Sequence, residues 1–194
     1  MGDAGQTDLE SRLIQRIAAG DERAFRELFE VYGKRVFRYA ARLIGDVPKA
    51  EEVTNDVMIE VWKSARRFEG RSSVSTWIIG ITRHLSLNAI RGKKWRTVDV
   101  ETVTDLADTD ETGEAMHDRD ALKETLRRAL AKLTPEHRDV VELTFFHGHS
   151  YQEIADIVGC PENTVKTRMF HAKKQLKVVL GARVAEAFSL GAAS

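Results

Sequence analysis

The 194-residue sequence has one cysteine, three prolines and no apolar run long enough to cross a membrane. A single cysteine, Cys160, cannot form an intramolecular disulfide, so nothing indicates an oxidising compartment. A membrane span needs about 18 consecutive apolar residues. The polar N-terminus also lacks the apolar core of a signal peptide. These absences predict a cytoplasmic protein with no membrane insertion.

Motifs for catalysis and metal binding are missing too. There is no Walker loop, no nucleophile elbow and no paired catalytic carboxylate. His147, His149 and Cys160 match neither a zinc-finger spacing nor an HExxH helix. The two histidines flank a glycine, where we expect them to be exposed to solvent. Cys160 is expected to be a half-buried turn residue, although a nearby helix N-terminus leaves a redox role open. The sequence therefore predicts a protein that is not an enzyme, with no cofactor and no metal site.

The net charge is zero, but the charges are segregated along the chain. Residues 83–96 contain five basic residues and no acid, and residues 162–178 contain five basic residues and one acid. Between them, residues 97–120 contain nine acids and one arginine. This asymmetry predicts separate contact surfaces. Because residues 96–118 are also poor in large apolar side chains, we expect a linker there.

Apolar residues recur at helical spacing almost throughout, and no convincing strand is found. In the first half, the pattern predicts a helix that ends at Gly20 and helices at about 21–43, 48–67 and 74–90, with Leu9, Phe29 and Trp62 among the inward side chains. The predicted fold class is all-α. Two small helical domains, 1–95 and 119–182, are joined by an acidic flexible linker, 96–118, and followed by a C-terminal tail, 183–194.

Residues 150–180 predict a helix-turn-helix and are the most informative segment. Ser150 and Glu153 form an S-x-x-E capping box, Gly159 suits a helix end, and Pro161 suits the first turn of the next helix. That second helix has an apolar inward face and a basic outward face, which favours insertion into a DNA major groove. A solvated basic helix in an ordinary bundle is the alternative. The candidate duplex-binding residues are Lys166, Thr167, Arg168, Phe170, His171, Lys173 and Lys174.

Basic and aromatic residues interleave between residues 71 and 96. Cations neutralise phosphates and aromatic side chains accept unstacked bases, so this pattern favours binding of single-stranded nucleic acid. The alternative is that Trp77 belongs to the core and that the basic end is a helix terminus favoured by the macrodipole. The candidate strand-binding residues are Arg71, Ser72, Ser73, Ser75, Thr76, Trp77, Arg83, His84, Asn88 and Arg91.

With these two halves, the chain resembles a bacterial RNA polymerase sigma factor of the extracytoplasmic-function (ECF) type, in the sigma-70 superfamily. Residues 21–94, DERAFRELFE to RGKK, resemble region 2, and residues 133–176, LTPEHRDVVE to AKKQL, resemble region 4. The resemblance implies that the first set of candidate residues meets the −35 duplex. It implies that the second set melts and binds the −10 element as a single strand.

The resemblance also implies partners. Core RNA polymerase is expected to bind through its β′ clamp coiled-coil and its β flap, and an anti-sigma factor is expected to hold the protein inactive. Spacing alone predicts a solvated mixed-charge face for the third helix. The resemblance instead implies that this face binds core polymerase, through Glu52, Asn55, Asp56, Ile59, Glu60, Trp62 and Lys63. A polymerase-independent DNA-binding regulator and a protein-interaction module stay open as alternatives.

Overall fold

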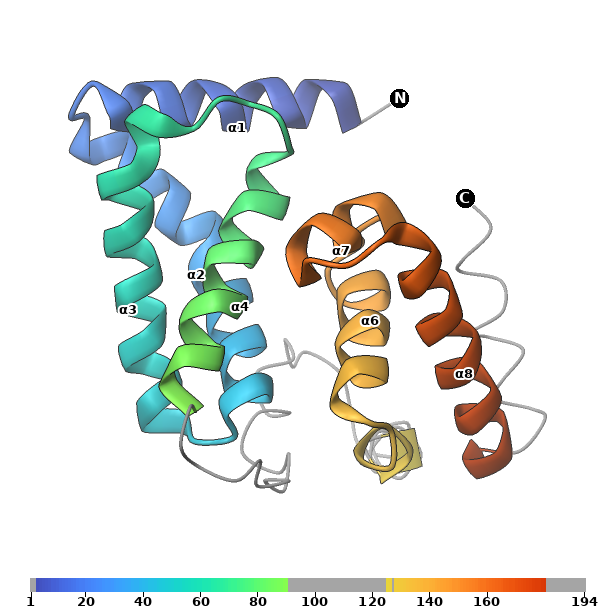
Figure 1. Cartoon of the computed structure of the whole chain (residues 1–194). Coiled ribbons are helices and arrows are strands. Elements are labelled where there is room, and N and C mark those ends of the chain that lie inside the picture. Colours follow the sequence, from blue (N-terminus) through green and yellow to red (C-terminus); the bar gives the residue numbers. More distant parts are fainter. Residues whose placement is uncertain (1–2, 91–124, 127, 181–194) are drawn as a thin grey trace, which may run out of the picture. The chain divides into compact units, whose positions relative to one another are not determined.

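The computed structural model describes residues 3–90, 125–126 and 128–180. The chain divides into two compact units, residues 1–105 and 106–194 (Figure 1). Every described residue with regular structure is helical, which confirms the predicted all-α class for this part of the chain. The predicted linker, the start of the second domain, the C-terminal tail and Arg91 lie outside the described residues. None of the described helices is long and apolar enough to cross a membrane.

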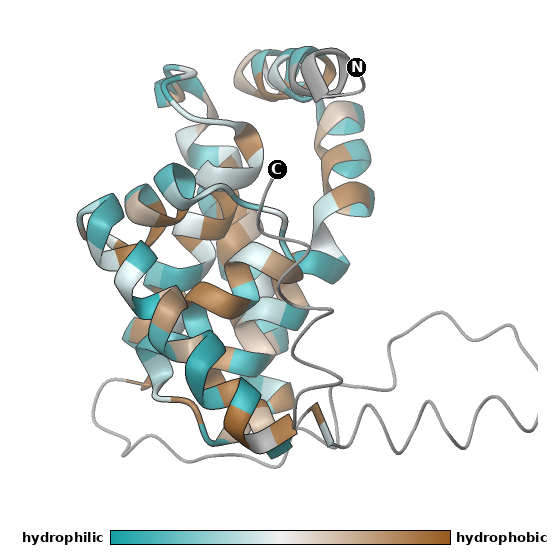
Figure 2. Cartoon of the chain, turned by 90° about the vertical axis from the view of Figure 1, so that its right-hand side faces the viewer, coloured by the Kyte–Doolittle hydropathy of each residue, from teal (hydrophilic) through white to brown (hydrophobic). Residues whose placement is uncertain are grey.

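The first unit contains helices α1 (Asp3–Ala18), α2 (Glu22–Ile44), α3 (Val47–Ser64) and α4 (Val74–Ile90), with a 3₁₀ turn, η1 (Ala65–Arg67), after α3. Helices α2, α3 and α4 pack against one another, and α1 lies across one end of them (Figure 1). Teal and brown alternate along the helices in Figure 2, as expected for amphipathic helices. Their apolar faces meet in one core, in which Leu28, Val57 and Ile78 are fully buried.

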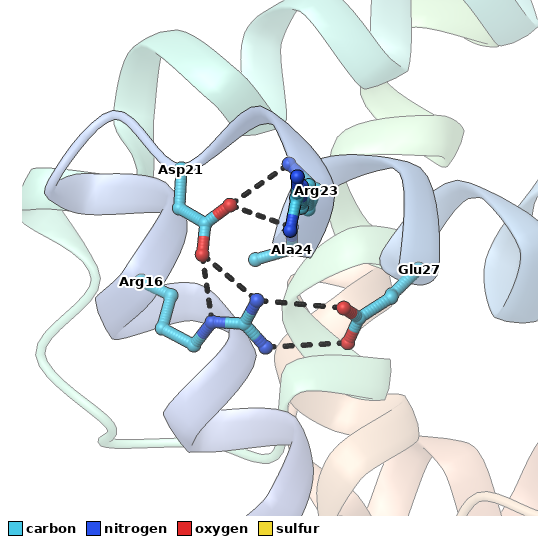
Figure 3. A network of polar contacts seen from close by, with 5 residues as sticks. All are labelled: Arg16, Asp21, Arg23, Ala24 and Glu27. Atoms are coloured by element: carbon cyan, nitrogen blue, oxygen red, sulfur yellow. Dashed lines mark hydrogen bonds and ion pairs between the residues drawn. The ribbon is translucent and has the colours of Figure 1, made fainter.

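Asp21 organises the junction between α1 and α2 (Figure 3). Its carboxylate accepts hydrogen bonds from the backbone N–H groups of Arg23 (2.8 Å) and Ala24 (3.1 Å), so it is the N-cap of α2. The same carboxylate accepts a 2.8 Å hydrogen bond from Nε of Arg16, and Arg16 also pairs with Glu27 at 3.3 Å. The hydrogen bond from Ala24, together with the Arg16 contact, lowers the pKa of Asp21. One carboxylate therefore both starts α2 and ties α1 to it.

Asp21→Ala is expected to lower the melting temperature by about 4 °C at neutral pH, the usual effect of losing a helix cap. Because the folded pKa is depressed, the stabilisation by Asp21 is complete above its unfolded pKa and is lost as pH falls below about 4. Thermal unfolding followed by circular dichroism at several pH values measures both effects. Glu30→Ala removes an exposed acid of the same helix and is the control. An equal change in both variants would contradict a capping role.

The second unit contains α6 (Pro135–Phe145), α7 (Tyr151–Val158) and α8 (Glu162–Leu180), preceded by helical residues 128–131. The predicted capping box is present, since the Ser150 and Glu153 side chains each bond the other's backbone. Gly159 ends α7 at φ +69°, in the left-handed region that glycine tolerates. The predicted bounds of α7 are thus confirmed, and α8 begins at Glu162, one residue after Pro161. Packing of α6 against both α7 and α8 holds the motif together.

The predicted exposure of His147 and His149 was wrong, because both side chains are buried. Gly148 adopts φ +69° and reverses the chain, and the N–H of His149 donates to the carbonyl oxygen of Leu143 at 3.0 Å. The two imidazole rings then stack at 6.3 Å, with 11° between their planes. Nε2 of His147 lies 3.9 Å from a carboxylate oxygen of the buried Glu142. The turn before the helix-turn-helix is therefore packed, not solvated.

Three side chains of the first unit that the sequence predicts to point inward are exposed or only partly buried. Leu9 is exposed near the start of α1, where it lines a groove rather than the core. Phe29 is 41% exposed because its ring lies over Gly33 of the same helix, where an added Cβ would come within 3.1 Å of the ring. Trp62 is 36% exposed at the edge of the apolar stripe of α3.

Candidate nucleic-acid and polymerase interfaces

The outward side of α8, here called the recognition face, consists of exposed side chains on a rigidly held helix. Val165, Met169, Ala172 and Leu176 are buried beneath it. Phe170 is 65% exposed, an unusual environment for a large apolar side chain. The other exposed members are Lys166, Thr167, His171 and Lys174. The predicted inward side of this helix is confirmed, and so is the outward side except at Lys173, which is half-buried.

Hydrogen bonds and ion pairs orient several side chains of the recognition face. Nζ of Lys166 lies 2.8 Å from Glu162 one turn earlier, and the Thr167 hydroxyl donates to the carbonyl oxygen of Asn163 at 2.9 Å. Two other candidates lie at the margin, because Arg168 and Lys173 are half-buried. Nη1 of Arg168 lies 3.8 Å from Sγ of Cys160, so Arg168 points toward the turn of the motif.

Sequence reasoning missed a contribution to this face from α6. The imidazole of His137 stacks on that of His171, with ring centroids 6.0 Å apart and 19° between the planes. Phe170 meets the ring of His171 edge-on at 5.5 Å. No signal within α6 could have identified His137, because its partner comes from a helix 34 positions later in the chain.

The loop after η1 and the start of α4 form the second candidate surface. Ser73 accepts a hydrogen bond from the N–H of Thr76 at 3.1 Å, and the two hydroxyls lie 2.7 Å apart. Ser73 thus caps α4, and Thr76 is only 4% exposed. Arg71 is exposed and pairs with Glu69, whereas Ser72 and Ser75 are half-buried. Two of the predicted contact residues, Ser73 and Thr76, therefore hold the loop and the helix together.

Further along α4, Trp77 is half-buried and packs against the core, with its ring 4.8 Å from that of Phe68. Farther along the helix, His84 and Asn88 are exposed and their side chains are joined at 3.0 Å. Arg83 is half-buried. The structure thus gives α4 a partly exposed aromatic ring near its start and polar groups further on, an arrangement that can accept unstacked bases and their backbone.

The outward side of α3 combines apolar and acidic side chains. Ile59 is 49% exposed, and the ring of Trp62 meets Phe25 edge-on at 5.3 Å. Polar residues surround these apolar groups: Glu52, Asn55, Asp56 and Lys63 are exposed, and Glu60 is half-buried. Glu52 pairs with Lys49, and Glu60 lies 3.6 Å from Arg67. An apolar centre with a polar rim is the usual composition of a protein–protein interface.

Comparison with known proteins decides between these possibilities. The family model "Sigma-70 region 2" matches residues 28–96, and "Sigma-70, region 4" matches residues 123–176. The ECF sigma factor RpoE of Cereibacter sphaeroides is 31% identical over 158 residues, which cover 81% of this chain and 86% of RpoE. The chain belongs to the ECF family of RNA polymerase sigma factors.

The alignment with another ECF relative also covers most of both chains. SigL of Mycobacterium tuberculosis is 29% identical over 169 residues, covering 86% of this chain and 94% of SigL. Two solved structures share the fold at 22% identity: CnrH in complex with the cytosolic domain of CnrY (TM-score 0.64, 90% of this chain and 98% of that one), and RpoE in complex with the anti-sigma factor NepR from Bartonella quintana (TM-score 0.61, 82% and 98%).

As a member of this family, the sigma factor is a transcription initiation factor that gives core RNA polymerase its promoter specificity. A polymerase-independent regulator is not favoured, because both regions are matched in the family order. Among the described residues, no group of three or more His, Cys, Asp or Glu side chains could hold a metal ion.

Proposed function

We propose that the sigma factor reads its promoter at two points, with the recognition face of α8 in the major groove of the −35 element. The observation that supports this most directly is the contrast between the two sides of α8. Its buried side fixes the helix, and its exposed side presents Lys166, Thr167, Phe170 and His171. Residues in the N-terminal part of a recognition helix are the ones that reach base edges.

At the second point, α4 and the loop before it bind the −10 element as a single strand. The partly exposed Trp77 ring and the exposed Arg71, His84 and Asn88 supply stacking and polar contacts. Capture of unstacked bases and contacts to phosphates provide the free energy of strand separation, without nucleotide hydrolysis and without an active site. Ser73 and Thr76 act indirectly, by fixing the loop at the start of α4.

Two surfaces of the sigma factor contact core RNA polymerase. The outward side of α3, centred on Ile59 and Trp62, binds the β′ clamp coiled-coil, and the second domain binds the β flap. Because the sigma factor acts together with RNA polymerase, its proposed location is the cytoplasm. An anti-sigma factor is a further partner. Support comes from the shared fold of CnrH and of RpoE from Bartonella quintana, whose solved complexes contain CnrY and the anti-sigma factor NepR.

Lys166→Ala is expected to reduce initiation about tenfold at promoters that depend on a −35 element, because a base or phosphate contact is lost from the groove. Lys177→Ala is the matched control: it removes the same charge from the same helix, three turns closer to its C-terminal end. Run-off transcription with reconstituted holoenzyme, on promoters with intact and scrambled −35 elements, measures the effect.

The variant should lose activity only where the −35 element is intact. Equal activity of Lys166→Ala and the wild-type protein on every promoter would refute groove insertion by α8. An equal loss for Lys177→Ala would indicate that only the total charge of the helix matters.

A further inference from the structure

His137 and His171 form an imidazole pair at the recognition face. His137 is on α6 and His171 is on α8, and their rings are nearly parallel at 6.0 Å. The two rings differ in environment: His171 is exposed, whereas Nδ1 of His137 is buried and has no hydrogen-bond partner within the described residues. A phosphate in the groove would therefore approach His171, with His137 behind it.

The surroundings of His137 favour its neutral form. Burial lowers the pKa of His137, and the neighbouring His171 and Arg168, both on α8, lower it further. Glu136, on the same helix as His137, acts in the opposite direction. A charge on either ring disfavours a charge on the other, so the pair accepts one proton more readily than two. A neutral ring beneath a charged one can stabilise it by a cation–π contact, which operates within about 6 Å.

We propose that binding of the −35 duplex is coupled to the uptake of one proton by this pair, with His171 carrying the charge and His137 positioning and stabilising the charged ring. The proposal rests on the proposed role of α8. DNA phosphates favour an imidazolium over a neutral imidazole at the exposed position. The cationic ring then adds a charge to a face that already presents Lys166 and Lys174.

The sign of the pH dependence follows from linkage. A group that binds a proton more tightly in the complex strengthens binding at low pH, and this contribution is lost as pH rises. Histidine is the side chain that changes its charge near neutral pH, so the dependence should appear between about pH 6 and about pH 8. Uptake of one proton limits the change in affinity to about tenfold per pH unit.

The test measures the affinity of reconstituted holoenzyme for a duplex selected from a randomised pool by the wild-type holoenzyme, at constant salt across this pH range. The wild-type affinity should fall as pH rises, by about threefold to tenfold per unit. His171→Gln should bind with little pH dependence. His137→Phe keeps a ring beneath His171 and should retain the wild-type slope, whereas His137→Ala should show a shallower one. Circular dichroism at each pH establishes that the variants are folded.

Each outcome separates the possibilities. A wild-type slope in His171→Gln would overturn the proposal. A flat profile in His137→Phe would overturn the assignment of the charge to His171, and a wild-type slope in His137→Ala would overturn the positioning role. Lys166→Ala distinguishes a failure of the proposed role of α8 from a failure of the proton coupling. If it binds the duplex as well as the wild-type protein, the proposed role of α8 fails, but if it binds weakly while His171→Gln keeps the slope, only the proton coupling fails.

Discussion

Ile59→Asp is expected to weaken the binding of core RNA polymerase by about 30-fold or more, the effect of losing an interface residue worth about 2 kcal/mol. Ile59 is 49% exposed in the free protein and lies beside Trp62 among acidic side chains. In the complex, a carboxylate at this position would be buried without a partner, which is costly. The substitution should leave the fold intact, because half of the side chain is already in water.

Val31→Asp is a closely matched control. Val31 is 54% exposed, is also β-branched and also lies on a helix of the first unit. It lines a groove between α1 and α2 with Leu9 and Leu13, away from the outward side of α3. Binding of labelled sigma factor to core polymerase, measured by fluorescence anisotropy, compares the two variants. Equal weakening by both would mean that the outward side of α3 is not the docking surface.

Leu143→Ala is expected to destabilise the second unit by about 3 kcal/mol and to leave the first unit unchanged. Leu143 is fully buried on α6, the helix that packs against both helices of the helix-turn-helix. The free energy of unfolding of a small domain is only a few kcal/mol, so a loss of about 3 kcal/mol removes most of it. Initiation should then lose its dependence on the −35 element, whereas binding to core polymerase through α3 should persist.

The positions of the tryptophans make this prediction measurable. Trp62 and Trp77 lie on α3 and α4, and residues 106–194 contain no tryptophan. Tryptophan fluorescence therefore does not report on the second unit, whereas circular dichroism reports on every helix. The variant should show an earlier transition by circular dichroism and an unchanged transition by fluorescence. Leu9→Ala is the control, since the same substitution at an exposed leucine should change neither. A parallel shift of both signals would mean that the two units unfold together.

The helices could be predicted from sequence because their signals are local. Ser150, Gly159 and Pro161 act within a few residues of the helix ends that they define. Ser150 and Gly159 cap α7 as predicted, and Pro161 directly precedes α8 instead of lying in its first turn. The apolar stripe of α8 was also clear, because its buried residues recur every three to four positions.

Features that depend on distant contacts could not be predicted. The burial of His147 and His149 follows from the left-handed turn at Gly148, and a glycine in the sequence does not reveal which way the chain will turn. His137 joins the recognition face only because α6 packs against α8. The sequence predicts Thr76 as a contact residue, yet Thr76 is buried by the packing of α4 and bonds the capping Ser73.

Helix α1 determines where a minimal fragment of the first domain can start. The region 2 family model begins at residue 28, but Ile14 and Ile17 of α1 are buried in the same core as Leu28. Arg66 also donates a 2.9 Å hydrogen bond to the carbonyl oxygen of Ala18, which fastens the end of α1 to η1. A fragment trimmed to the family limits would expose an apolar surface and would tend to aggregate. Fragments for crystallisation or binding studies should therefore include α1.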